Sequence, residues 1–233
     1  MSEDTHQPVL RCGFVAILGA PNAGKSTLLN RLVGAKVSIV THKVQTTRSQ
    51  IRGIAVFGET QIVFVDTPGI FAPKKRIERA MVDAAWSGAA DADQLVLLVD
   101  GQRGIDPNVR RIVEGIAASD RKAILAINKV DAVKRSDLLA LAEALNADGV
   151  FSDTFMISAL NGDGVDDLRD TLVARMPAGP WLYPEDQLSD LPQRLLAAEI
   201  TREKAYLRLH QELPYALAVD TDGIDGTEDN AGA

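Results

Sequence analysis

Four short clusters of glycine, hydroxyl, carboxylate and amide residues have the composition and spacing needed for chemistry. The first reads Gly-Ala-Pro-Asn-Ala-Gly-Lys-Ser over residues 19–26, between an apolar run and a segment that we predict as a helix. Glycines let a backbone wrap closely around an anion, and a helix N-terminus attracts negative charge. Lys25 would reach the β- and γ-phosphates of a nucleotide, and the Ser26 hydroxyl would bind Mg²⁺. A glycine turn with a surface lysine is the alternative, and the strand–loop–helix context disfavours it.

The second cluster, Asp-Thr-Pro-Gly at residues 66–69, ends another predicted strand. Asp66 can hold Mg²⁺ through water, and the Gly69 N–H can contact a γ-phosphate, so this loop would sense hydrolysis. Taken alone, the tetrapeptide would equally well be a surface turn.

The third and fourth clusters predict which base is bound. Asn-Lys-Val-Asp at residues 128–131 follows a strand, and the Asp131 carboxylate can accept hydrogen bonds from N1–H and the 2-amino group of guanine. Adenine offers no such pair of donors, and a bidentate contact to a base edge in DNA is worth roughly 1–3 kcal/mol. The Lys129 stem would lie along the base, and Asn128 would tie this loop to the phosphate loop. Ser-Ala-Leu at residues 158–160 would place a backbone N–H at guanine O6. A charged surface loop is the alternative for residues 128–131.

The elements that must position these clusters alternate along the chain. We expect strands at residues 12–18, 52–57, 61–65, 95–99, 123–127 and 154–157. We expect helices at residues 25–33, 77–90, from Asp106-Pro107 onward, and at 136–146 and 165–174, with a loop at 37–51. Most strands are apolar on both faces, which predicts an α/β fold with a mostly parallel sheet covered by helices on both faces. Right-handed crossovers then bring the loops after the strands to one edge.

Composition limits the compartment and the partners. The 233 residues are 46% apolar, enough for one sizeable core, and the single cysteine, Cys12, fits a reducing cytoplasm. The polar N-terminus predicts no signal peptide, and no apolar run approaches the roughly 18 residues of a membrane span. The net charge of −7 lies in residues 184–233, which hold 4 Lys+Arg against 11 Asp+Glu. Such an acidic segment repels nucleic acid.

In order and spacing, the four clusters resemble the G1, G3, G4 and G5 motifs of translation-factor-like GTPases. Within that superfamily the chain resembles the Era family, through GAPNAGKSTLLN at residues 19–30, Gln-Thr-Thr-Arg at 45–48 and Tyr-Pro-Glu-Asp-Gln at 183–187. RLLAAEITREK at residues 194–204 and Glu-Leu-Pro-Tyr at 212–215 extend the resemblance over nearly the whole chain. It implies a GTPase that binds GTP and GDP with Mg²⁺.

The resemblance also assigns roles to residues. The implied nucleotide-binding residues are Gly19, Ala20, Pro21, Asn22, Ala23, Gly24, Lys25, Ser26, Thr27, Asp66, Thr67, Pro68, Gly69, Ile70, Asn128, Lys129, Val130, Asp131, Ser158, Ala159 and Leu160. Lys25 and Thr47 would be catalytic, and Ser26, Thr47 and Asp66 would hold Mg²⁺, with Thr46 the less favoured alternative to Thr47. Asn22 resembles the asparagine that binds K⁺ in some of these GTPases, although it is as easily a plain turn residue. Ile70 stands where many small GTPases carry a water-orienting glutamine, and relatives of Era are also apolar there.

Resemblance further implies a type II KH RNA-binding domain that acts on 16S rRNA and the small ribosomal subunit, partly as a peripheral protein of the inner membrane. We expect a monomer. A KH fold clamps RNA with a Gly-x-x-Gly loop. The match at residues 223–226 is acidic and followed by no helix, so we expect an incomplete KH-like segment and weakened RNA binding.

The expected organisation is a disordered N-terminus at residues 1–11, a GTPase domain at 12–176, a linker at 177–190, the KH-like segment at 191–219 and a disordered tail at 220–233. Within the KH-like segment we expect a helix at residues 191–210 and a strand at 215–219. Two other functions stay open. One is an ATP-using P-loop enzyme such as a kinase, against which Asn-Lys-x-Asp argues. The other is a GTP-binding module without significant turnover or RNA binding.

Overall fold

The computed structural model describes residues 9–38, 40, 51–67, 69–71, 76–190, 197, 198, 200, 201, 203 and 204. The chain divides into two compact units, with the boundary between Asp190 and Leu191. In the second unit the described residues are helical, within the helix predicted at residues 191–210. The predicted strand at 215–219 and the two predicted disordered ends, apart from residues 9–11, lie outside the described residues. None of the described helices is long and apolar enough to cross a membrane.

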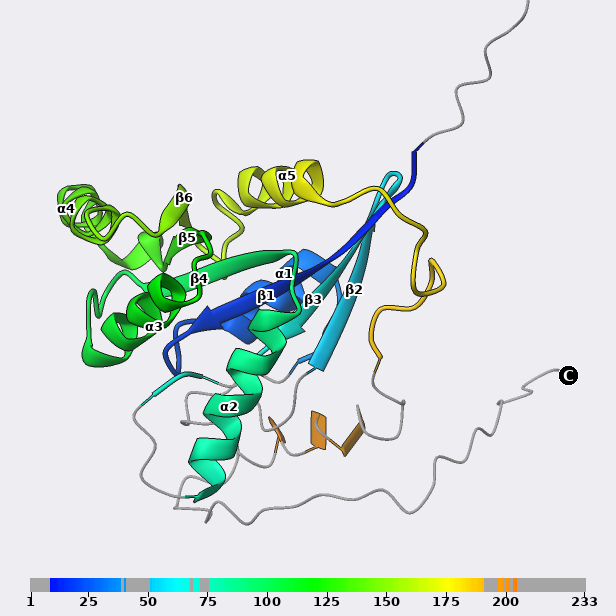
Figure 1. Ribbon diagram of the computed structural model, residues 1–233, viewed down its shortest axis with the longest axis horizontal. Helices are drawn as coiled ribbons and strands as arrows, with labels where there is room; N and C mark the ends of the chain where they lie inside the picture. The colour runs from blue at the N-terminus through cyan, green and yellow to red at the C-terminus, as the bar shows by residue number, and fades with distance from the viewer. Residues whose placement is uncertain are drawn as a thin grey trace, which may run out of the picture. The chain divides into compact units, whose positions relative to one another are not determined.

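A mixed sheet forms the centre of the first unit (Figure 1). In the described part of the chain it has six strands in the order β2-β3-β1-β4-β5-β6, with β2 antiparallel to β3 and every other pair parallel. The strands are β1 (Arg11–Gly19), β2 (Ile51–Phe57), β3 (Thr60–Asp66), β4 (Gln94–Asp100), β5 (Ala123–Asn128) and β6 (Phe151–Ile157). The fold class predicted from the sequence is therefore confirmed.

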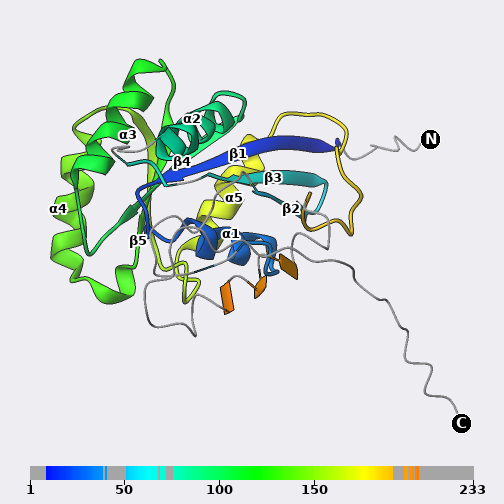
Figure 2. The ribbon, with the colours of Figure 1, turned by 90° about the horizontal axis from the view of Figure 1, so that it is seen from below.

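Helices cover both faces of this sheet. They are α1 (Lys25–Val33), α2 (Arg76–Ala90), α3 (Pro107–Ala118), α4 (Arg135–Asn146) and α5 (Val165–Arg175). Alternate side chains of β1 enter opposite cores: Val15 and Ile17 pack with α1 and α5, whereas Ala16 and Leu18 pack with α2, α3 and α4. Figure 2 shows α2 and α3 on one side of β1 and β3, with α1 on the other. This double burial is why the strands are apolar on both faces.

Most predicted element bounds agree with the structure, and the exceptions have tertiary causes. Arg11, which we expected in a disordered N-terminus, begins β1 and forms an isolated bridge with Ala178. β6 begins at Phe151, three residues earlier than predicted, and its polar start is bound by α5, because Arg175 donates to Ser152 Oγ (3.0 Å) and Asp153 Oδ2 (2.5 Å). The predicted cap of α3 is confirmed, with Asp106 accepting from the first turn of the helix.

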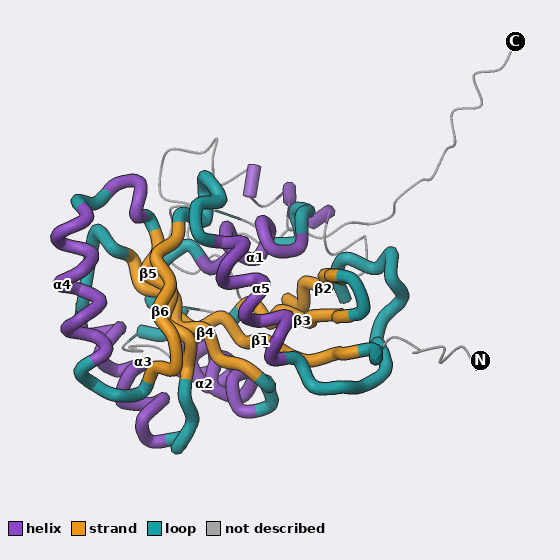
Figure 3. The backbone as a smooth tube through the Cα atoms, turned by 90° about the horizontal axis from the view of Figure 1, so that it is seen from above, coloured by secondary structure: helices purple, strands orange, loops and turns teal. Residues whose placement is uncertain are grey.

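Residues 177–190, which we expected to be a linker, form a strap along the sheet (Figure 3). The Cys12 N–H donates to the Pro177 carbonyl oxygen at 3.1 Å, and further along the strap the Ile54 N–H donates to the Leu188 carbonyl oxygen at 2.9 Å. The side chain of Gln61, which is fully buried, holds the middle of the strap: Oε1 accepts from the N–H groups of Leu182 (2.9 Å) and Tyr183 (3.1 Å). Gln61 Nε2 donates back to the Tyr183 carbonyl oxygen at 2.8 Å. The Gln61 carboxamide thus both accepts from and donates to the backbone of the strap, as the backbone of a neighbouring strand would.

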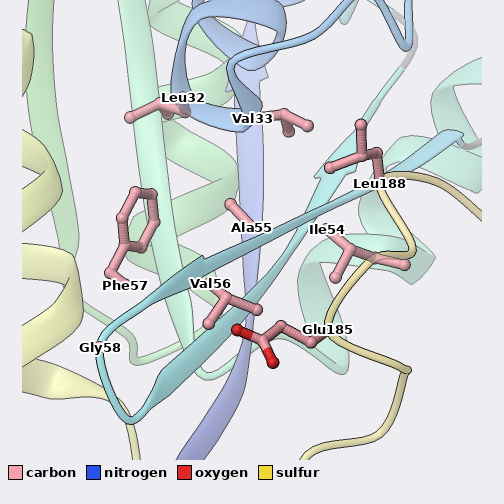
Figure 4. Close-up of a pocket in the computed structure, with 9 residues that line it drawn as sticks. All are labelled: Leu32, Val33, Ile54, Ala55, Val56, Phe57, Gly58, Glu185 and Leu188. Carbon is pink, nitrogen blue, oxygen red and sulfur yellow. The ribbon is translucent and has the colours of Figure 1, made fainter.

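A groove of about 420 Å³ lies between the end of α1, strand β2 and the strap (Figure 4). Leu32 and Val33 come from α1, the floor comes from β2 and its turn, and Leu188 and Glu185 come from the strap. None of the predicted site residues lines it.

Candidate functional site

The four clusters meet at one edge of the sheet because each follows the carboxyl end of a strand. The phosphate loop (residues 19–26) begins at the last residue of β1, and residues 66–69 begin at the last residue of β3. The base loop (residues 128–131) begins at the last residue of β5, and residues 158–160 come directly after β6. β3, β1, β5 and β6 run parallel and are joined through β4, so their carboxyl ends point the same way. This is the edge where ligands bind in open α/β sheets.

Backbone conformation shapes the phosphate loop. Gly24, which precedes α1, has φ 103°, a value that favours glycine, and a Cβ there would lie 2.3 Å from Asn128 Nδ2. Asn22 also lies in the left-handed region, with φ 64°. Residues with a side chain are uncommon there and such strain gathers at functional sites. The loop therefore depends on residue type at two positions.

Lys25 is buried inside the phosphate loop. Its side chain donates from Nζ to the carbonyl oxygens of Gly19 (3.1 Å) and Ala20 (3.0 Å). Burial lowers the pKa of Lys25 to about 8, and the negative charge of Asp66 opposes part of that shift. An anion bound in the loop would favour the ammonium form and give it a partner of opposite charge.

A hydroxyl–carboxylate cluster lies beside the lysine. Ser26 Oγ donates to Asp66 Oδ2 at 2.9 Å, and Ser38 Oγ donates to the same oxygen at 2.6 Å. Asn30 holds the backbone at Ser38 in place, because its Oδ1 accepts from the N–H groups of Val37 and Ser38, both at 2.9 Å. Hydroxyl and carboxylate oxygens suit Mg²⁺, which proteins often bind through one or two such groups plus substrate phosphates. The described residues contain no group of three or more His, Cys, Asp or Glu that could hold a metal ion.

The loop after β3 packs directly on the phosphate loop. Thr67 Oγ1 donates to the Ile17 carbonyl oxygen at 2.7 Å, and the Ile70 N–H donates to the Gly19 carbonyl oxygen at 3.1 Å. A Cβ on Gly69 would lie 2.9 Å from the backbone nitrogen of Pro21. The Ile70 side chain is fully buried in the core shared with α2, α3 and α4. Only the backbone of Ile70 therefore lies at the phosphate loop.

Asn128 joins three of the loops. Its Nδ2 donates to the Ala23 carbonyl oxygen at 2.8 Å, and its Oδ1 accepts from the Ala159 N–H at 2.9 Å. The contact between Asn128 and the phosphate loop, predicted from the sequence, is thus present. Because the Ala159 N–H is used in this bond, the N–H of Leu160 becomes the candidate donor for a base.

In the rest of the base loop, the carboxylate of Asp131 is exposed and the ammonium of Lys129 is paired with Asp100. Asp131 lies in η1 (Val130–Ala132), a turn of 3₁₀ helix, and is exposed. Lys129 has φ 68°, and its Nζ lies 2.5 Å from Oδ2 of Asp100, the last residue of β4. Asp100 was not among the predicted site residues, although it too lies at the carboxyl end of a strand.

Arg31 of α1 holds the loop after β6. Its Nε donates to the Ala159 carbonyl oxygen at 2.7 Å, and its guanidinium also bonds the carbonyl oxygen of Leu160. Ser158 Oγ accepts from the Asn161 N–H at 3.1 Å, which closes the same turn. Arg31 and Ser38 were likewise not predicted, because nothing near them in the sequence marks their partners. Val130 lies in the base-loop turn and Thr27 in the first turn of α1. Thr46, Thr47 and Pro68 lie outside the described residues.

The sheet order and the connected loops define the class of protein: it is a P-loop GTPase. Comparison with known proteins agrees, since residues 14–129 match the 50S ribosome-binding GTPase family. The GTPase Era of Agrobacterium fabrum is 59% identical over 229 residues, which cover 98% of this chain and 72% of that protein. The GTPase Era of Caulobacter vibrioides is 58% identical, over 95% of this chain and 74% of that protein. The chain belongs to the Era family of GTPases.

Solved structures extend the comparison to the fold. A crystal structure of Era in complex with MgGDPNP and nucleotides 1506–1542 of 16S ribosomal RNA is 40% identical, with a TM-score of 0.83, and covers 88% of this chain and 70% of that chain. An Aquifex aeolicus Era variant bound to GDP·AlF4⁻ has a TM-score of 0.82 at the same identity. The bacterial selenocysteine-specific elongation factor EF-Sec, 20% identical with a TM-score of 0.56, shares the fold.

Proposed function

We propose that this GTPase is a nucleotide switch that binds GTP with Mg²⁺ at the connected loops and acts on 16S rRNA during assembly of the small ribosomal subunit. The observation that carries the nucleotide-binding part of this proposal is the position of Asn128, which bonds the phosphate loop on one side and the loop after β6 on the other. Through the two hydrogen bonds of Asn128, binding of phosphate in the phosphate loop would be coupled to binding of the base in the base loop.

In the proposed site the phosphate loop supplies charge and backbone donors. Lys25 would leave the Gly19 and Ala20 carbonyl oxygens for the phosphates, and the N–H groups at the start of α1 would bind the same anion. Ser26 and Asp66, with Thr47 from the sequence prediction, would hold Mg²⁺. When bound, Mg²⁺ neutralises charge on the phosphates. Hydrolysis is expected to be slow, because the side chain of Ile70 is apolar and buried and cannot orient a water.

Selectivity for guanine rests on Asp131 in this proposal. Its exposed carboxylate would accept from guanine N1–H and the 2-amino group, while the Leu160 N–H would donate to O6. Calorimetric titration should show GTP binding far more tightly than ATP, and Asp131→Asn should exchange GTP affinity for affinity toward xanthine nucleotides. Asp148 is a surface carboxylate that pairs with Arg110 at 3.3 Å, so Asp148→Asn is the matched control. This variant should bind GTP and ATP with the affinities of the parent chain. Equal affinities of the parent chain for GTP and ATP would contradict the proposed base recognition.

Turnover separates the switch from a binding module. Phosphate release by the purified chain should require Mg²⁺ and be lost in Lys25→Ala. GTP binding without phosphate release would favour a binding module.

We also propose that Asn22 helps to hold K⁺ beside the phosphates, supported by its left-handed backbone within the loop. Replacing K⁺ by Na⁺ at fixed ionic strength should then slow turnover, and equal rates would contradict this role.

The 16S rRNA partner is supported by the Era crystal structure that contains it. Residues 184–233 carry 4 Lys+Arg against 11 Asp+Glu, and RNA affinity depends on basic residues that neutralise phosphates. We therefore expect weak binding of a 16S rRNA fragment by the 233-residue polypeptide in filter binding at about 0.15 M salt, near physiological screening. Submicromolar saturable binding would reveal an RNA site elsewhere on the chain. Monomeric state and peripheral membrane association stay predictions, open to sedimentation and vesicle flotation.

A further inference from the structure

We propose that Asp100 is a positioning residue of the base site. It binds Lys129 and so keeps the ammonium away from Asp131, whose carboxylate must remain available for guanine. This inference rests on the proposed role of Asp131, and it adds a specificity-determining residue that lies outside the four sequence clusters.

The sheet puts Asp100 beside the base loop. Asp100 and Asn128 are register partners at the carboxyl ends of the parallel strands β4 and β5, so Lys129 is the first residue beyond the pair. The Gly101 N–H donates to the Asn128 carbonyl oxygen at 2.8 Å, which ties the two strand ends together. A Cβ on Gly101 would lie 3.0 Å from that oxygen, so the two backbones approach closely. Asp100 therefore has a defined place beside the start of the base loop.

Both carboxylate oxygens of Asp100 are used. Oδ1 accepts from the Gln102 N–H at 2.9 Å, and Oδ2 lies 2.5 Å from Lys129 Nζ. The Asp100 side chain is 6% exposed and that of Lys129 33% exposed. A second cation, Arg103, is 3.8 Å from Oδ2 and is 54% exposed. A carboxylate this buried requires a cation, and Lys129 is the one in direct hydrogen-bond contact.

Lys129 also has an unusual backbone conformation, in a turn where the Ala132 N–H donates to its carbonyl oxygen at 3.0 Å. Its φ of 68° and ψ of 35° place a residue with a Cβ in the left-handed region, which is unfavourable unless surrounding contacts hold it there. The ion pair with Asp100 is such a contact. Two residues further on, Asp131 is exposed in the 3₁₀ turn.

Without the Asp100 charge, the ammonium of Lys129, which precedes Asp131 by two residues, would be released to pair with the Asp131 carboxylate. A lysine bound to that carboxylate would occupy the oxygens that guanine N1–H and its 2-amino group need. The loss should therefore be largest for ligands that depend on both oxygens. Hypoxanthine lacks the 2-amino group, so IDP depends on Asp131 less than GDP does.

Asp100→Asn tests this, because it keeps an acceptor oxygen for the Gln102 N–H and removes the charge. We expect GDP affinity to fall about tenfold, equivalent to about 1.4 kcal/mol, in calorimetric titration. The preference for GDP over IDP should fall as well, whereas general loosening of the fold would weaken both ligands alike. In a Lys129→Met background, Asp100→Asn should cause no further loss of GDP affinity. Asp148→Asn is the control and should leave both affinities unchanged.

Two results would overturn the inference: an unchanged GDP/IDP ratio in Asp100→Asn, or a tenfold loss that persists in the Lys129→Met background. Thermal unfolding of each variant shows whether it is folded. Binding of ADP as tightly as GDP by the parent chain would instead contradict the proposed base recognition. The two failures are therefore distinguishable.

Discussion

Substitution of Asn128 by alanine should damage both the fold and nucleotide binding. Asn128 is 3% exposed, and its side chain bonds the Ala23 carbonyl oxygen and the Ala159 N–H. Ala23 and Ala159 are themselves 1% and 2% exposed, so water cannot easily replace the lost partner. Asn128→Ala therefore leaves one buried acceptor and one buried donor without their bonds.

The expected loss of stability in Asn128→Ala follows from these two hydrogen bonds. A typical hydrogen bond contributes about 0.5–1.5 kcal/mol net, and a buried group left unsatisfied costs about 1–3 kcal/mol. For one donor and one acceptor we expect Asn128→Ala to lower the free energy of unfolding by about 2–4 kcal/mol. Because the same bonds align the phosphate and base loops, we expect the Kd for GDP to rise at least about tenfold, or 1.4 kcal/mol.

Urea unfolding of the nucleotide-free chain and calorimetric GDP titration measure the two effects. Asn146→Ala is the matched control, since Asn146 Nδ2 also donates to a backbone carbonyl, that of Ala142 at 2.8 Å, and its Oδ1 accepts from Thr154 Oγ1 at 3.1 Å. The contacts of Asn146 with Thr154 are exposed, so its loss should cost under about 1 kcal/mol and leave GDP binding unchanged. If Asn128→Ala cost no more than Asn146→Ala, the bridging argument would be refuted.

Three further predictions concern other parts of the unit. The pKa of Lys25 is lowered to about 8 from its usual 10.5, so between these values the unfolded chain binds a proton that the folded chain does not. The free energy of unfolding of the nucleotide-free chain should therefore rise from pH 8 to pH 10.5, by about 3 kcal/mol relative to Lys25→Met; an identical pH profile in both would contradict this. Ile70→Ala should lower the free energy of unfolding by about 2–5 kcal/mol in urea while turnover stays within about tenfold, and a thousandfold loss of turnover with binding intact would show a direct role in hydrolysis. Gln61→Leu removes three bonds to Leu182 and Tyr183 and should cost about 2–3 kcal/mol, with faster proteolysis in the strap; unchanged proteolysis would mean that the strap is held by its other contacts.

Local sequence was enough to predict the class of fold and the loops of the candidate site. Strands apolar on both faces and separated by helices imply a covered parallel sheet, and parallel strands bring their following loops to one edge. Glycine at position 24 and lysine at position 25 predict an anion loop because the requirement is local: a permissive backbone at a helix N-terminus. The same holds for Asp106, whose capping bonds reach only two and three residues along the chain.

The tertiary structure decided which other residues complete the site. Ser38 acquires its role through Asp66, 28 residues away, and Arg31 through Ala159, 128 residues away. Gln61 turns an expected linker into a strap by bonding Tyr183, 122 residues away. Local sequence shows that such side chains can donate or accept hydrogen bonds, but it does not show which distant backbone will lie within 3 Å. That distance is set by strand order and helix packing, which bring together segments remote in the chain.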